Sequence, residues 1–271
     1  MAAADAVFGT SSFIAKRDVS LARALLERFS RDRILKRHLP KDLGSVPILV
    51  SPDSILRLWR PSVDSDLFDF AREFVQPGNV VWDIGANVGV LSMAAAQRAG
   101  SSGQVVAVEA DIWLAGLLSK SAAMQPATSA RIQVLTAAAA DSLGVARFNI
   151  AQRGRASNFL DHAGGSTQSG GIRETVSVIT LTLDWLLVMG FAPPQVLKID
   201  VEGAESSVLS GAERVLAEAR PVILCEVYGP SSAFVTELLH RHGYTLFDWD
   251  AKPRVQTDYA FYNTLAIPPA L

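Results

Sequence analysis

The stretch Val80-Val-Trp-Asp-Ile-Gly-Ala-Asn-Val-Gly89 decides the fold of this chain, because an apolar strand runs directly into a turn with two glycines. Gly85 and Gly89 allow the backbone to turn sharply and to approach a ligand where a Cβ atom would collide. The helix predicted over Val90–Ala99 offers N–H groups at its N-terminus. A strand, a glycine turn and a helix in this order predict a nucleotide-binding α/β unit.

The details of the turn favour S-adenosylmethionine over NAD. The spacing Gly-x-x-x-Gly lacks the first glycine of the dinucleotide fingerprint Gly-x-Gly-x-x-Gly. Asp83 lies at the end of the strand, before the turn. A pyrophosphate gains nothing from this carboxylate, whereas the ammonium group of S-adenosylmethionine can be held by it, directly or through water.

A second acidic residue follows the next predicted strand. Gln104–Val108 is apolar and ends in Glu109, where a parallel strand presents its last side chain to a ribose. Charge-assisted hydrogen bonds are each worth roughly 1.5–3 kcal/mol, so loss of Glu109 should weaken binding about tenfold or more. Asp83 could instead cap the turn, and Glu109 could be a solvated strand end. Their positions on consecutive strands favour a shared ligand site.

The composition indicates an enzyme with one main domain. The chain has 271 residues, 49% hydrophobic content and a net charge of −2, which gives a large core and no general preference for nucleic acid. The single cysteine, Cys225, excludes an internal disulfide framework and a multi-cysteine metal site. The sequence shows no apolar stretch of about 18 residues and no secretory signal, so we expect a cytoplasmic protein.

The N-terminal residues differ in charge from the rest. Lys16 to Lys41 contains nine Lys and Arg against three Asp and Glu, with apolar residues at helical spacing from Leu21 to Leu39. We therefore expect residues 1–42 to form a basic amphipathic helical extension before a domain at 43–271. The extension could pack on the domain or on a dimer partner, or it could contact a membrane surface or an anionic substrate.

Alternating strands and helices continue after Glu109, and the pattern then breaks. Following a third strand, Val145–Ile150 and Thr175–Leu181 alternate like antiparallel strands and predict an inserted hairpin. A Gly- and Ser-rich loop at about 153–171 connects them. Loops of this length are lids, binding loops or disordered segments.

A second group of charges lies in Val196-Leu-Lys-Ile-Asp-Val-Glu-Gly-Ala-Glu205. A strand buried on both faces should be apolar, so the charges at Lys198, Asp200 and Glu202 indicate a functional site. Glu226 interrupts the next strand in a similar way. These carboxylates could take a proton from an acceptor hydroxyl, orient that hydroxyl, or hold a divalent cation. The sequence does not rank these roles, and we predict no metal.

Several of these motifs together resemble the FkbM-type family of S-adenosylmethionine-dependent methyltransferases. The resemblance extends from about residue 43 to residue 267. It implies an α/β class I methyltransferase fold, which is a Rossmann-like, mostly parallel sheet of seven strands with helices on both faces and an antiparallel last strand. It also implies S-adenosylmethionine as cofactor and O-methylation of sugars, glycolipids or secondary metabolites. The motifs are Asp-Ile-Gly-Ala-Asn-Val-Gly (83–89), Val-Val-Ala-Val-Glu (105–109), Thr-Leu-Asp (182–184), Lys-Ile-Asp-Val-Glu-Gly-Ala-Glu (198–205) and Cys-Glu-Val (225–227).

The resemblance also implies roles for single residues. The glycine turn would line the amino-acid and sulfonium end of the cofactor, Glu109 would bind the ribose, and three carboxylates would face the acceptor. The chain departs from the family pattern at two positions on the adenine side. Ala110 stands where these proteins usually begin a Glu-Pro pair. Asp141 is only a near substitute for the residue that holds the adenine amine. The cofactor residues are Asp83, Gly85, Ala86, Asn87, Gly89, Glu109 and Asp141, and the catalytic residues are Asp200, Glu202 and Glu226.

Two other functions fit the sequence less well. An NAD-type oxidoreductase is disfavoured by the missing fingerprint and by the absence of an obvious Tyr-x-x-x-Lys pair after the turn. A non-catalytic cofactor-binding module is disfavoured because the carboxylates Asp200, Glu202 and Glu226 are all present. The expected partner is a small-molecule or glycan acceptor, with no nucleic acid.

Overall fold

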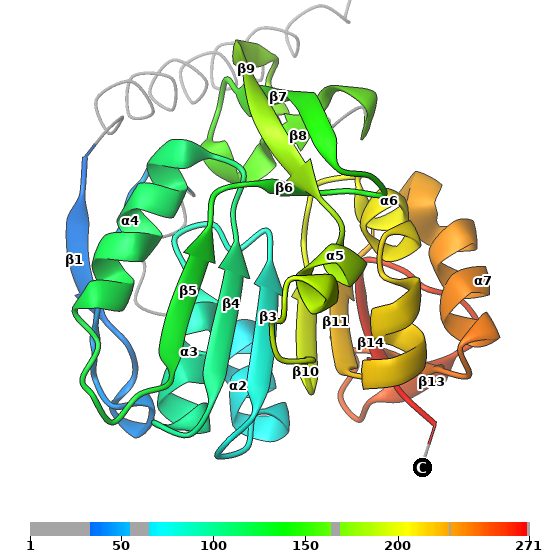
Figure 1. Cartoon of the computed structure of the whole chain (residues 1–271), viewed down its shortest axis with the longest axis horizontal. Coiled ribbons are helices and arrows are strands. Elements are labelled where there is room, and N and C mark those ends of the chain that lie inside the picture. Colours follow the sequence, from blue (N-terminus) through cyan, green and yellow to red (C-terminus); the bar gives the residue numbers. More distant parts are fainter. Residues whose placement is uncertain (1–32, 55–64, 164–168, 228, 270–271) are drawn as a thin grey trace, which may run out of the picture.

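A sheet of eight strands forms the centre of the molecule (Figure 1). The computed structural model describes residues 33–54, 65–163, 169–227 and 229–269. The order across the sheet is β13-β12-β14-β11-β10-β3-β4-β5. The strands are β3 (Val80–Ile84), β4 (Gln104–Val108), β5 (Arg131–Leu135), β10 (Val196–Ile199), β11 (Val222–Glu226), β12 (Thr245–Asp248), β13 (Val255–Thr257) and β14 (Asn263–Ile267).

This sheet is mostly parallel, with an antiparallel last strand, as predicted. β3, β4, β5, β10 and β11 pair in parallel, and β14 lies antiparallel between β11 and β12. The predicted count of seven is one short, because β13 adds an eighth strand beside β12. Val255–Thr257 is short and largely exposed, so it lacks the apolar run that predicts a buried strand.

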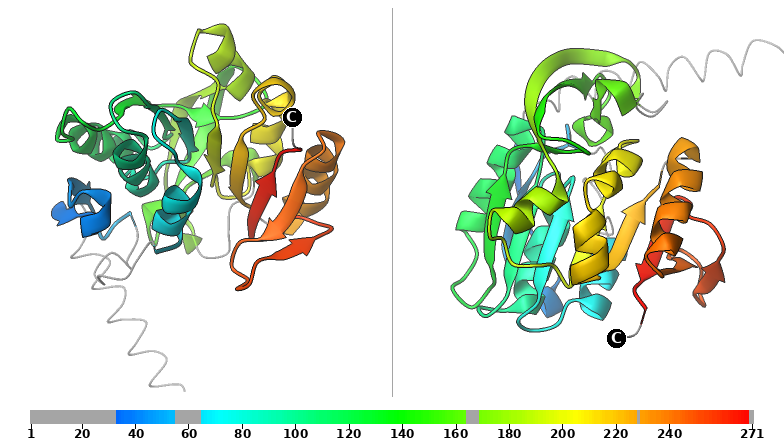
Figure 2. Two further views of the ribbon diagram at one scale, coloured as in Figure 1. Left: turned by 90° about the horizontal axis from the view of Figure 1, so that it is seen from below. Right: turned by 45° about the vertical axis from the view of Figure 1, so that its right-hand side comes forward.

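Helices cover both faces of the sheet, as predicted (Figure 2). Residues of α2 (Ser65–Phe74), α3 (Val90–Ala99) and α4 (Ile112–Ala123) belong to one core cluster. Residues of α5 (Leu183–Val188), α6 (Glu205–Ser210) and α7 (Ser232–Arg241) belong to the other. Successive side chains of a strand point to opposite faces of the sheet. In β3, Val81 accordingly packs in the first cluster and Trp82 in the second.

One predicted helical region is corrected by the structure. Leu35–His38 is not helical: it forms strand β1, antiparallel to β2 (Pro47–Val50), so this pairing crosses the predicted boundary at residue 42. Tertiary pairing here overrides the helical spacing of the apolar residues. Residues 1–32 of the predicted extension lie outside the described residues.

The helical segment that follows β10 is interrupted. α6 ends at Ser210, and a separate π-helical turn covers Val215–Ala219. Gly211 lies between them against the backbone carbonyl of Ala140, where a Cβ atom would overlap with the carbonyl oxygen. Short 3-10 turns occur at Lys41–Leu43, Arg155–Ser157, Asp161–Ala163 and Gly229–Ser231.

The inserted hairpin is part of a separate four-stranded sheet. β7 (Gly144–Ala151) and β9 (Ile172–Leu181) pair as predicted, and β6 (Ala138–Ala139) and β8 (Phe159–Leu160) extend them in the order β6-β9-β7-β8. This inserted sheet lies above the carboxyl ends of β3, β4 and β5 (Figure 1). Much of the predicted loop 153–171 is therefore regular structure, while 164–168 lies outside the described residues.

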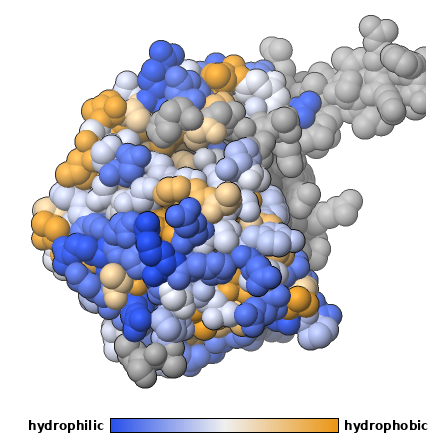
Figure 3. Space-filling model, turned by 90° about the vertical axis from the view of Figure 1, so that its right-hand side faces the viewer, coloured by the Kyte–Doolittle hydropathy of each residue, from blue (hydrophilic) through white to orange (hydrophobic). Residues whose placement is uncertain are grey.

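The surface near α7 is largely polar. On the face shown in Figure 3, hydrophilic residues form a continuous area and hydrophobic residues lie in smaller separate groups. In the parts of the chain that the structure describes, no helix has the length and apolar character needed to cross a membrane.

Candidate active site

A cavity that is partly open to solvent lies between the central sheet and the inserted sheet, and the space in it, open solvent included, is about 570 Å³. Gly85, Asn87 and Glu109 line it from β3 and β4, and Asp200 and Glu202 line it from the end of β10. The structure therefore brings members of both predicted groups to one cavity at the carboxyl edge of the sheet, where open α/β sheets bind ligands. Ala86 and Gly89 lie outside its lining.

Contacts within the protein, which the sequence does not reveal, require glycine at both positions of the turn. Gly85 and Gly89 have φ angles of +72° and +86°. A Cβ atom on Gly85 would overlap with the backbone carbonyl oxygen of Asp200, and one on Gly89 would lie 2.8 Å from Cγ of Leu118. The glycines are thus required by packing within the protein, and not only by the approach of a ligand.

The backbone N–H groups of the turn 85–89 are already hydrogen-bonded inside the protein. Those of Gly85 and Ala86 donate to the carbonyl of Val108, and that of Gly89 donates to Ala86. The N–H of Asn87 donates to Glu109 at 2.7 Å, and the N–H of Val88 donates to the side-chain oxygen of Asn87. The turn therefore offers the cavity the carboxamide nitrogen of Asn87 rather than backbone donors.

Glu109 is held rigidly at the end of β4. Its Oε2 accepts from the N–H of Asn87, and its Oε1 accepts from the N–H of Asp111, both at 2.7 Å. The residue is 7% exposed, and burial is the main cause that raises the pKa of this carboxyl to about 7. Each oxygen keeps a further lone pair, so the ionised group can still accept from two hydroxyls in the cavity.

Asp83 lies beneath the turn, outside the residues that line the cavity. The register of β3 and β10 places it beside Lys198, whose Nζ is 3.7 Å from Asp83 Oδ1. Asp83 also accepts a 2.6 Å hydrogen bond from the Ser92 hydroxyl. Lys198 Nζ donates to the carbonyl of Gly85 at 2.9 Å, so this buried pair supports the turn from below.

Asp200 and Lys198 connect this buried pair to the cavity. Nζ of Lys198 lies 3.2 Å from Asp200 Oδ2, and the Asp200 side chain is 34% exposed. Burial alone would lower the pKa of Lys198, but the carboxylates of Asp200 and Asp83 outweigh it and raise the pKa. The ammonium group is therefore a fixed positive charge next to Asp200.

Glu202 and Glu226 differ in their access to the cavity. Glu202 lines it in a left-handed conformation with φ 52°, which is strained for a residue with a side chain. Glu226 lies at the end of β11, outside the lining, and bonds to the Tyr262 hydroxyl. Burial, followed by the charge of Asp200, raises the pKa of Glu202 to about 8 and that of Glu226 to about 7.

Asp141 lies outside the cavity lining, in an exposed turn. Its N–H donates to the Ser207 hydroxyl at 3.0 Å, and its carboxylate accepts from Ser142 at 2.9 Å. At this edge Ala137, Ala138 and Ala139 line the cavity instead. The described residues contain no group of three or more His, Cys, Asp or Glu side chains placed to hold a metal ion.

The sequence reasoning missed the residues that the inserted sheet contributes. Phe148, Arg155, Asn158 and Leu160 all line the cavity. Arg155 stands in a Gly- and Ser-rich stretch, and its partner Asp111 is 44 positions away. No local pattern pairs residues at such a separation, although the charge of Arg155 within a polar stretch was a weak signal.

Comparison with known families supports a methyltransferase. The profile of the Methyltransferase FkbM domain matches residues 83–246, more than half of the chain. This match agrees with the resemblance in the motifs and does not support the NAD-type oxidoreductase. No curated protein matches the sequence.

Solved structures of methyltransferases show weaker similarity. A methyltransferase FkbM from Methylobacillus flagellatus KT has 16% identity and a TM-score of 0.46, over 73% of this chain and 50% of that protein. The present chain thus spans about half the length of that protein. A precorrin-6y C5,15-methyltransferase from Geobacter metallireducens GS-15 has 14% identity and a TM-score of 0.44, over 78% and 93% of the two chains. A SAM-dependent O-methyltransferase from Thermotoga maritima has 12% identity and a TM-score of 0.40, over 83% and 75%.

Proposed function

We propose that this chain, which belongs to the Methyltransferase FkbM domain family, transfers a methyl group from S-adenosylmethionine to a hydroxyl of a sugar, glycolipid or secondary metabolite. The observation that carries the proposal is the position of Asp200. Its partly exposed carboxylate lies in the cavity lining at the end of β10, next to the ammonium group of Lys198.

The residues of the cavity fit S-adenosylmethionine. Glu109 has free lone pairs for the two ribose hydroxyls, and the Asn87 carboxamide lies beside it in the lining. Asp83 is separated from the cavity by the turn, so a contact with the ammonium group of the cofactor would run through water. When bound, the cofactor supplies a methyl group on a sulfonium, which is already an activated leaving group.

The protein then has to position the acceptor and remove one proton. We assign Asp200 as the general base, which takes the hydroxyl proton as the acceptor oxygen bonds to the methyl carbon and the carbon–sulfur bond breaks. Lys198 holds this carboxylate in place at 3.2 Å. Glu202, with a pKa of about 8, is largely protonated at neutral pH and can donate a hydrogen bond that orients the acceptor.

Glu226 is the remaining carboxylate of the predicted set. It lies outside the cavity lining and bonds to Tyr262, and we assign it no direct contact with the acceptor. Its pKa of about 7 allows it to exchange protons near neutral pH. Loss of Glu226 should therefore reduce the rate less than loss of Asp200.

The test is a transfer assay with methyl-labelled S-adenosylmethionine and a panel of neutral sugars, glycolipids and hydroxylated natural products. With an accepted substrate, Asp200→Asn should lower turnover by about 10²–10⁴-fold while binding of S-adenosylhomocysteine is unchanged. Glu218→Gln is the matched control, because Glu218 pairs with Arg214 on the surface. Full turnover in Asp200→Asn would exclude this base, and label found only on amines would refute O-methylation.

A further inference from the structure

The inserted sheet is tied to the rest of the protein by an ionic cluster of Asp53, Asp111, Arg155 and Arg173. Arg155 contacts Asp53 through Nε at 3.0 Å and Asp111 through Nη1 at 2.5 Å. Arg173 holds both oxygens of Asp53, at 2.8 and 3.0 Å. The side chains of Asp53 and Asp111 are at most 3% exposed, so two buried carboxylates are balanced by two guanidinium groups.

The ionic cluster joins three separate parts of the chain. Asp53 lies just after β2, Asp111 begins α4, and both arginines belong to the inserted sheet region. Backbone hydrogen bonds reinforce the junction, because the N–H of Arg155 donates to the carbonyl of Asp53 at 2.7 Å and that of Ala156 donates to Ser54 at 2.8 Å. The position of Arg155 is therefore fixed in both backbone and side chain.

A short chain of contacts leads from Arg155 to the cavity. Asp111 accepts from Arg155 through Oδ2, and its own backbone N–H donates to Oε1 of Glu109 at 2.7 Å. Oδ1 of Asp111 accepts from the N–H of Trp113 at 2.9 Å in the first turn of α4. The geometry of the Glu109 carboxylate thus depends on Asp111, which Arg155 holds from the other side.

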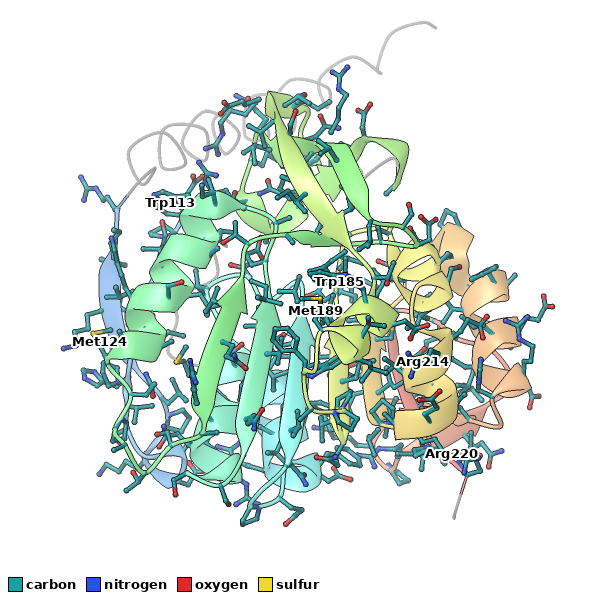
Figure 4. All side chains as sticks on the ribbon, in the orientation of Figure 1. Trp113, Met124, Trp185, Met189, Arg214 and Arg220 are labelled. Atoms are coloured by element: carbon teal, nitrogen blue, oxygen red, sulfur yellow. The ribbon has the colours of Figure 1, made fainter. Side chains whose placement is uncertain are left out.

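Arg155 also borders the cavity directly. Its guanidinium lies 4.9 Å from the centre of the Trp113 ring, and Trp113 is at the end of α4 that faces the inserted sheet (Figure 4). Arg155 lines the cavity together with Asn158, whose side-chain nitrogen donates to Asp111 at 2.8 Å. Arg173, in contrast, lies outside the lining and shares only Asp53 with Arg155.

We propose that the inserted sheet is the outer wall of the cofactor site and that Arg155 is a positioning residue for the cofactor, acting through Asp111 on Glu109. This inference rests on the proposed function. Asp53 and Arg173 hold the inserted sheet in place. Arg155 also holds Asp111, whose backbone N–H positions the Glu109 carboxylate that would bind the ribose. In this cluster, Arg155 therefore affects cofactor binding, whereas Arg173 only attaches the inserted sheet to the rest of the protein.

This difference allows a controlled test with the full chain. Binding of S-adenosylhomocysteine and the melting temperature are measured for the wild type and for Arg155→Met, Arg155→Lys and Arg173→Met. In Arg155→Met, Asp53 keeps Arg173, and Asp111 keeps Asn158 and the N–H of Trp113, so we expect it to fold. Both methionine variants should lower the melting temperature.

The binding results separate the two roles. Arg155→Met should weaken S-adenosylhomocysteine binding at least about tenfold, Arg155→Lys should recover part of this loss, and Arg173→Met should stay within about twofold of the wild type. Wild-type affinity in Arg155→Met, or equal losses in both methionine variants, would overturn the inference. Failure of the wild type itself to bind would refute the proposed function, and the inference with it.

Discussion

The backbone carbonyl oxygen of Asp200 occupies the place that a Cβ atom on Gly85 would take. The end of β10 and the glycine turn after β3 are thus in direct contact, and Asp200 presents its carboxylate to the cavity from the same point. Lys198 strengthens this junction, because its Nζ contacts both the carbonyl of Gly85 and the carboxylate of Asp200. The cofactor turn and the acceptor carboxylate are built as one unit.

This contact predicts that Gly85→Ala destabilises the protein even without a ligand. Alanine at a left-handed φ costs about 1–2 kcal/mol, and the overlap with Asp200 adds about 1–3 kcal/mol. Urea unfolding of the ligand-free protein measures the loss. Gly116→Ala is the control, because Gly116 is within α4 with nothing within 4 Å of a new Cβ. It should stabilise the helix by about 0.5–1 kcal/mol. Equal stability of the two variants would contradict the packing explanation.

The burial of Glu109 predicts that cofactor binding depends on pH. The pKa of Glu109 is raised to about 7, and only the ionised carboxylate has acceptors for both ribose hydroxyls. The affinity for S-adenosylhomocysteine should therefore fall as the pH is lowered from 8 to 6, by up to about tenfold per pH unit below 7. Titration calorimetry at several pH values tests this. Glu109→Gln should bind more weakly and without this pH dependence, so an unchanged slope in the variant would assign the titration to another group.

Glu202 predicts a pH dependence of stability with the opposite sign to that of a salt-bridged carboxylate. Burial and nearby carboxylates raise the pKa of Glu202 in the folded protein to about 8, from an ordinary value of 4.5. Between pH 4.5 and pH 8 the folded state binds more protons than the unfolded state. The contribution of Glu202 to the free energy of unfolding is therefore fully present below about pH 4.5 and is lost as the pH rises through about 8. For one titrating group, the free energy of unfolding changes with pH by at most about 1.4 kcal/mol per pH unit.

Urea unfolding between pH 5 and pH 8 measures this effect. Glu202→Gln, which does not titrate, should make the decline in stability with pH shallower than in the wild type. Glu237→Gln, on the exposed side of α7, should leave the wild-type slope unchanged. A decline that is as steep in Glu202→Gln as in the wild type would exclude Glu202 as its source.

Much of the central sheet could be predicted from sequence because each buried strand carries its own signal. β3, β4 and β11 are short apolar runs next to a glycine turn, an acidic residue or a proline, and these features are local. The charges at Asp200 and Glu202 stood out because in the sequence they interrupt an apolar run, but the structure ends β10 at Ile199, so these two residues follow the buried strand. Both residues are in the cavity lining.

The remaining features depend on contacts between distant residues. β1 forms because Leu35–His38 pairs with β2, and nothing within that segment predicts this pairing. Glycine is required at position 85 because the backbone carbonyl of Asp200 lies against it. The wall of the cavity depends on the contacts of Arg155, in the inserted sheet region, with Asp53 and Asp111. Such relationships appear only when the chain is folded.

The most direct test of the central claim is a calorimetric titration of the purified chain with S-adenosylhomocysteine, with NAD as the competing ligand and Glu109→Ala as the variant. We predict that S-adenosylhomocysteine binds and NAD does not, and that Glu109→Ala weakens this binding about tenfold or more. Binding of NAD in preference, or no binding of S-adenosylhomocysteine, would contradict the assignment of the cavity as a methyltransferase site.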